Sequence, residues 1–173
     1  MVERTEWIKR QFSFGLPLGM YPNVVERVRG TPARLEDLTR GLRPEILIRR
    51  DGDGWSIQEQ VGHLLDLEPL GMLRLDDYEA ERETLVAADM QNRKTHEANH
   101  NAHTIENILS AFRKERMEFV RRLDAYDEEF VQRTALHPRL NLKVRVIDLA
   151  FFIAEHDDHH LARISELRRS LLG

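Results

Sequence analysis

The sequence contains no cysteine, which excludes disulfide bonds, thiolate metal ligands and cysteine nucleophiles together. A zinc site in this chain would therefore have to use histidine, aspartate or glutamate. No apolar run approaches the roughly 20 residues that span a bilayer. The first residues, Met1–Arg4, are polar and lack the hydrophobic core of a signal peptide. We therefore expect a cytoplasmic protein with no membrane partner.

The chain also lacks an excess of positive charge, since its formal net charge is −4. A domain that grips DNA or RNA usually presents a large basic surface, so we expect no nucleic-acid partner. Apolar residues make up 41% of the 173 residues and charged residues 32%, a mixture that suits amphipathic helices around a core. The length is that of one domain, and we expect residues 1–173 to form it.

Alternation of apolar and polar residues is scarce, so the sequence predicts no β-sheet. Helical periodicity instead marks four main regions. The first spans about 3–29 and is interrupted by glycine and proline, the second begins after Ser56, the third begins at Ile105, and the last spans about 143–171. A polar, Asn-rich stretch over about 89–103 predicts a long connection, and residues 137–141 predict a turn.

Two helix starts have clear signatures. Ser56 and Glu59 form the S-x-x-E pattern of a capping box, and Pro69 is expected to bend the helix that follows rather than end it. Thr31 followed by Pro32 resembles an N-cap before a first-turn proline, which predicts a short extra helix over 31–41. Four main helices with one long crossover predict an all-α four-helix bundle.

The strongest chemical signal is the segment EHDDHH at residues 155–160. His156 and His160 are four residues apart and share one helical face with the apolar residues of the last helix, whereas His159 points elsewhere. A buried imidazole nitrogen without a partner costs about 1–3 kcal/mol. A shared metal ion would satisfy both rings, and hydrogen bonds to buried side chains are the alternative.

His63 is the third candidate ligand, because it lies two turns inside the capped helix among leucines. A single helical histidine is more often structural. Its assignment as a ligand therefore depends on whether this helix packs against the last one.

Three segments together resemble a known family. Residues 55–66, WSIQEQVGHLLD, resemble the W-[ST]-x-x-[EQ]-x-x-x-H-x-x-D segment of the DinB/YfiT-like superfamily. Residues 153–164, IAEHDDHHLARI, are similar to that family's closing H-x-x-x-H helix, and the turn at Leu136-His137-Pro138 is also similar. The likeness spans nearly the whole chain in order and spacing.

The resemblance implies an up-down-down-up four-helix bundle that holds one divalent metal ion with His63, His156 and His160. It implies zinc or nickel as the ion, with iron or manganese as alternatives, and a homodimer as the assembly. Members are described as metal-dependent hydrolases or as thiol-dependent transferases and isomerases, so an unidentified small molecule is the expected substrate.

A second histidine group, His96, His100 and His103, has the spacing H-x3-H-x2-H. On a helix these residues would share a face and could bind a separate metal ion. Their asparagine neighbours favour a polar loop, in which they would be solvated or line the rim of a pocket. One of them, or Glu97, could also reach the main metal ion.

Three histidines leave a coordination position open, which favours catalysis over a closed structural site. The leading hypothesis is hydrolysis by an activated water, and transfer of a low-molecular-weight thiol is the alternative. A third hypothesis is a non-catalytic stress or scaffold bundle, with or without a bound metal ion, which would have no pocket beside the histidines. Candidate proton acceptors are Glu59, Asp66 and Glu155, although Glu59 also completes the capping box and the other two could only orient a ligand. Asp157 and Asp158 are expected to be solvated.

Overall fold

The computed structural model describes residues 2–172 as a bundle of long helices with short connecting elements. The long helices are α1 (Tyr21–Arg29), α2 (Thr31–Thr39), α4 (Ile57–Glu79), α6 (Ile105–Ala125) and α8 (Val146–Leu172). The short helices are α3 (Pro44–Leu47), α5 (Arg93–Glu97) and α7 (Glu128–Val131), with 3-10 turns at Trp7–Lys9, Leu18–Met20 and His100–Ala102. The strands are β1 (Thr134–His137) and β2 (Leu142–Arg145). Within the described residues, no helix is long and apolar enough to cross a membrane.

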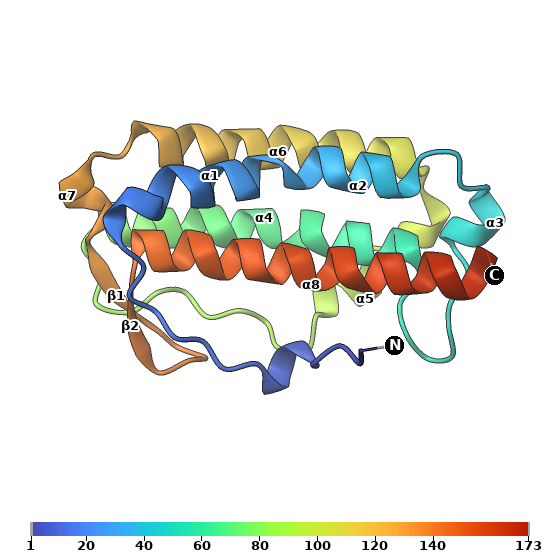
Figure 1. Ribbon diagram of the computed structural model, residues 1–173, viewed down its shortest axis with the longest axis horizontal. Helices are drawn as coiled ribbons and strands as arrows, with labels where there is room; N and C mark the ends of the chain where they lie inside the picture. Colours follow the sequence, from blue (N-terminus) through green and yellow to red (C-terminus); the bar gives the residue numbers. More distant parts are fainter. Residues whose placement is uncertain (1, 173) are drawn as a thin grey trace.

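The four layers of the bundle follow the up-down-down-up order that the family resemblance implies. The α1–α2 pair and α8 run in one direction, and α4 and α6 run in the opposite direction (Figure 1). Because α4 and α6 are consecutive and parallel, residues 80–104 have to return along the length of the bundle. This return is the predicted long crossover, and it contains α5.

The first layer of the bundle is built from two helices rather than one. α1 and α2 meet at Gly30 and lie end to end against α6 and α8 (Figure 1). The predicted short helix over 31–41 is confirmed as α2, and it supplies half of this layer. Thr31 is not the N-cap, since Gly30 occupies that position and the Thr31 hydroxyl donates instead to Asp157.

The capped start of α4 is confirmed. The Ser56 side chain accepts a hydrogen bond from the Glu59 amide, and the Glu59 carboxylate accepts one from the Ser56 amide. Pro69 lies inside the helix without ending it. This box starts α4 at Ile57, so that His63 lies in its second turn.

The N-terminal arm, residues 2–17, is extended apart from its one 3-10 turn. The helix predicted over 3–29 is therefore confirmed only for α1. Gly15 has a φ of +122°, which a helix does not allow, and Pro17 follows it. The arm is tied to α8 by two ion pairs, in which Arg4 pairs with Glu166 and Arg10 pairs with Glu155. Figure 1 shows the course of the arm.

A short β-hairpin, which the sequence did not predict, lies between α7 and α8. β1 and β2 are antiparallel, with Ala135 opposite Val144 and His137 opposite Leu142. The predicted turn at 137–141 is the hairpin loop, and Asn141 adopts a φ of +53° there. Each strand is only four residues long, too short for alternation to reveal it.

The core consists of two apolar clusters with a polar layer between them. One cluster gathers α1, the ends of α4 and α6, the hairpin and the start of α8, and the other gathers α2, α3 and the remaining parts of α4, α6 and α8. Between them lie buried charged and imidazole side chains, among them His63, Glu68, Arg116, Asp157 and His160. The buried polar side chains are therefore concentrated between the two apolar clusters, near the middle of the bundle.

Candidate metal centre

Three histidines from two helices meet in the polar layer. His63 of α4 and His156 and His160 of α8 each offer a ring nitrogen, and these nitrogens all lie within 4.8 Å of one another. The ring centres of His63 and His160 are 4.8 Å apart, and those of His63 and His156 are 5.5 Å apart. Within residues 2–172, no other group of three potential ligands converges in this way.

Hydrogen bonds orient two of the rings. Nδ1 of His63 lies 3.0 Å from the Thr95 hydroxyl, and Nδ1 of His160 lies 2.6 Å from the side-chain oxygen of Gln60. Thr95 and Gln60 are themselves buried. These partners turn Nε2 of each ring toward the shared centre, which is how outer contacts usually fix ligand histidines.

The donor set fits a divalent metal ion. The Nε2 atoms of His156 and His160 are 3.2 Å apart. Two ligands at 2.0–2.1 Å from a tetrahedral zinc ion would be about 3.4 Å apart. The Gln60 oxygen accepts the proton on Nδ1 of His160, so Nε2 of that ring carries a lone pair that faces the other rings.

Burial keeps all three imidazoles in the neutral form, which is the form that binds metal ions. It lowers the pKa of His63 to about 4 and holds the pKa values of His156 and His160 well below the usual histidine range. The proximity of the rings adds to the effect, because a charge on one disfavours a charge on the next. At neutral pH the rings are therefore uncharged and can donate lone pairs to a metal ion.

A cavity of about 250 Å³ opens beside the three histidines. Pockets for drug-sized ligands measure roughly 300–1,000 Å³, so this cavity suits a smaller molecule. Its walls are mostly apolar and aromatic, formed by residues such as Trp7, Trp55, Leu67, Phe119 and Phe152. The non-catalytic hypothesis predicted no such space beside the histidines.

Comparison with known proteins identifies the family. The sequence pattern of the DinB superfamily matches residues 27–164, which is most of the chain. The chain belongs to the DinB superfamily. The three converging histidines of this DinB protein lie within the matched segment, and so do the hairpin and most of the cavity wall.

Two solved structures share the fold. YfiT from Bacillus subtilis, described as a probable metal-dependent hydrolase with an unusual four-helix bundle topology, superposes with a TM-score of 0.78 at 19% identity over 93% of each chain. A mycothiol-dependent maleylpyruvate isomerase superposes with a TM-score of 0.67 at 10% identity, over 85% of this chain and 60% of the other. No curated protein sequence matches the chain significantly.

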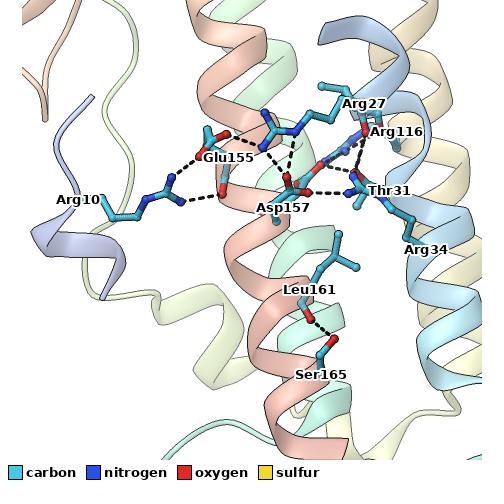
Figure 2. A network of polar contacts seen from close by, with 11 residues as sticks. Arg10, Arg27, Thr31, Arg34, Arg116, Glu155, Asp157, Leu161 and Ser165 are labelled. Atoms are coloured by element: carbon cyan, nitrogen blue, oxygen red, sulfur yellow. Dashed lines mark hydrogen bonds and ion pairs between the residues drawn. The ribbon is translucent and has the colours of Figure 1, made fainter. Parts of the chain in front are cut away.

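The three carboxylates that the sequence offered as proton acceptors all lie outside the cavity wall. Glu59 is held by Ser56 and Arg50, and its pKa is lowered against the opposing effect of burial. Asp66 accepts from Nε2 of His100 at 2.8 Å. Glu155 pairs with arginines of the N-terminal arm and α1 (Figure 2). Each is therefore already engaged by a neighbouring side chain, and a role in proton transfer stays a prediction.

The second histidine group does not form a metal site. His96 and His103 are exposed, whereas His100 is buried and bonded to Asp66. None of the three lines the cavity. The long connection predicted for residues 89–103 is confirmed. The solvated role predicted for the group is wrong for His100, because this side chain is buried and anchors the crossover on α4.

Gly62 makes this anchoring possible, because a Cβ atom there would overlap the His100 ring. We expect Gly62→Ala to displace the crossover and to break the contact between Thr95 and His63. The melting temperature should fall by about 4 °C or more, since each kcal/mol of lost stability lowers it by about 2–4 °C in a domain of this size. The matched control is Gly71→Ala on the same helix, whose Cβ would make an ordinary contact with Phe119. Equal melting temperatures for the two variants would contradict this account.

A buried ion cluster lies next to the histidines, and the sequence did not reveal it. Arg116 is 2% exposed and pairs with Glu68 at 2.7 Å. It also pairs with Asp157, which accepts a hydrogen bond from the Thr31 hydroxyl (Figure 2). Asp157 was expected to be solvated and is 1% exposed. Asp158 is half-buried and pairs with Arg27 and Arg34.

Sequence reasoning also missed residues that line the cavity. Trp7 of the N-terminal arm packs against His156 with ring centres 4.8 Å apart, and Trp55 packs against His63 at 4.7 Å. Trp55 belonged to the recognised family segment, but its contact was not foreseen. The hairpin and α4 contribute Arg74, His137 and Arg139.

Proposed function

We propose that this protein is a mononuclear metal-dependent hydrolase of the DinB type, with His63, His156 and His160 as the ligands of one zinc or nickel ion. The observation that carries the proposal is the convergence of three neutral imidazoles at the wall of a mostly apolar cavity. An ion held there would acidify a water molecule and polarise a bound carbonyl or phosphoryl group.

The chain itself contributes orientation and a dry environment. Thr95 and Gln60 hold two of the rings, and Trp7 and Trp55 pack against His156 and His63. Glu68 is a carboxyl group on the cavity wall, and burial raises its pKa although Arg116 opposes the shift. Arg116 donates to both of its oxygens, so Glu68 belongs to the ion cluster beside the histidines.

The alternative function is transfer of a low-molecular-weight thiol. The shared fold with a mycothiol-dependent isomerase supports it, and so does the apolar wall, which suits a thioether-forming substrate. The homodimer and the cytoplasmic location remain predictions.

A paired assay separates these functions. The full chain loaded with zinc or nickel is tested for hydrolysis of p-nitrophenyl esters, and for conjugation of an electrophile such as 1-chloro-2,4-dinitrobenzene with added thiols. We expect ester hydrolysis without thiol, at least tenfold slower after chelation or in His160→Ala, and unchanged in His103→Ala, whose exposed ring lies outside the cavity. Activity that depends on thiol selects the alternative, and activity that survives chelation contradicts both.

A further inference from the structure

The cavity has a second chemical feature, made by Arg74, His137 and Arg139. We call these three residues the basic end of the cavity. They come from α4 and from the hairpin, and the positive charges of both arginines act on His137. The metal-site proposal uses none of them, and each has hydrogen-bonding capacity that no protein group satisfies.

Arg74 is a buried cation without an ion-pair partner. It is 4% exposed, and its only side-chain hydrogen bond goes from Nε to the Val86 carbonyl at 3.2 Å. Across residues 2–172, no carboxylate lies within ion-pair distance of its guanidinium group. Burial lowers the pKa of Arg74 to about 10, so the group keeps its charge at neutral pH. A buried charge of this kind is costly unless something else neutralises it.

The Nε2 nitrogen of His137 carries a proton that no acceptor within residues 2–172 receives. The side chain is 1% exposed, and Nδ1 accepts from the Leu140 amide at 3.4 Å, which places the ring proton on Nε2. Nε2 is the one buried side-chain nitrogen or oxygen without a partner in the part of the chain that the structure describes. Native proteins leave few such groups, and each calls for an explanation.

Arg139 lies at the same end in the hairpin loop. Its guanidinium stacks over Trp7 at 5.2 Å and over Phe152 at 5.9 Å, and it donates to the Trp7 carbonyl at 3.1 Å. Within residues 2–172 it pairs with no carboxylate. A planar guanidinium held by stacking retains free N–H groups for a planar anion.

The acidic groups on the cavity wall do not compensate these charges, because each is already paired. Glu68 and Asp157 share Arg116, and Asp89 pairs with Arg93 at 3.1 Å. Asp77 favours the charged form of Arg74 from outside the wall, but it is itself bonded to the Val86 amide and paired with Arg82. The basic end is therefore a concentration of positive charge and donors without an ion-pair partner in the described chain, within a mostly apolar wall.

We infer that the basic end binds the carboxylate of the substrate, so that this enzyme acts on a small organic acid whose reactive group reaches the metal centre. Arg74 and Arg139 would donate in pairs to the two oxygens, and Nε2 of His137 would donate to one of them. This inference rests on the proposed function, because it adds the substrate class to the same cavity.

The geometry also limits the size of the acid. Eleven residues of α4 separate His63 from Arg74, which is about 16 Å along the helix axis before the side chains reach inward. With the cavity volume of about 250 Å³, this favours a chain of a few carbon atoms between the carboxylate and the reactive group.

Calorimetric titration of the zinc-loaded full chain tests the inference without turnover. The probes are hexanoate and its neutral counterpart hexanamide. Hexanoate is expected to bind at least tenfold more tightly than hexanamide, and Arg74→Met and Arg139→Gln are each expected to remove that difference. The matched control is Arg82→Gln, an exposed arginine just beyond α4 that does not line the cavity and should bind hexanoate like the wild type.

Thermal unfolding separates a binding role from a structural one. If Arg74 is kept for an anion, Arg74→Met should raise the melting temperature of the ligand-free protein by about 2–4 °C, because an unpaired buried charge is removed. A lower melting temperature would assign Arg74 a structural role and overturn the inference.

The two proposals fail independently. Hexanoate binding that is equal in the wild type, Arg74→Met and Arg139→Gln, or matched by hexanamide, overturns the carboxylate site while leaving zinc content and hydrolysis untouched. Absence of bound zinc together with arginine-dependent hexanoate binding overturns the hydrolase and leaves the anion site standing.

Discussion

His156→Ala is expected to abolish stoichiometric binding of zinc or nickel, and His160→Ala should do the same. Each variant leaves two imidazoles, and two neutral ligands hold a divalent ion far more weakly than three. Changes to outer contacts of a ligand cost roughly 10–100-fold in metal affinity, so loss of a ligand should cost at least about 100-fold. Elemental analysis after gel filtration measures this directly, and the loss of metal-dependent thermal stabilisation gives a second readout.

His159→Ala is the matched control, because it removes an imidazole from the same helix and the same cavity wall. The His159 ring contacts Arg4 and lies outside the triad. This variant should keep its full metal content. Unchanged metal content in His156→Ala and His160→Ala would show that the three rings are not ligands, and the enzymatic proposal would lose its basis.

Arg116→Ala is expected to lower the free energy of unfolding by about 3–5 kcal/mol, the typical cost of breaking a buried pair by removing one partner. The arginine is 2% exposed and neutralises both Glu68 and Asp157. Its removal leaves two carboxylates buried next to each other. Urea denaturation at neutral pH measures the change.

Arg121→Ala, one helical turn further along α6, provides the control. Arg121 also forms an ion pair, with Glu118 at 2.5 Å, but its side chain is 68% exposed. Exposed pairs contribute about 0–1 kcal/mol, so this variant should unfold nearly like the wild type. If the two variants cost the same, the cluster around Arg116 is not the electrostatic link between the helices that its burial indicates.

The local features of the sequence determined most of the helical framework. The capping box at Ser56 and Glu59 placed the start of α4, because capping depends on contacts within one turn. The four-residue spacing placed His156 and His160 on one inward face, because a regular helix fixes that geometry. The long crossover followed from its polar composition.

Other features depend on contacts between residues far apart in the chain. The N-terminal arm and the four-residue strands have no periodicity of their own and are positioned by α8 and by each other. The local pattern EHDDHH predicts that Asp157 is solvated. Asp157 is buried because Arg116 of α6 pairs with it, and the local sequence does not show that contact. Such pairings leave no local pattern.

The amino-acid sequence by itself therefore determined which residues could bind a metal ion and which helices carry them. Only the tertiary structure decided that His63 meets the other two rings, that the carboxylates near them are engaged elsewhere, and that Arg74, His137 and Arg139 share the same cavity. The physical reason is range: helix geometry acts over a few residues, whereas burial and charge pairing depend on how the finished layers pack.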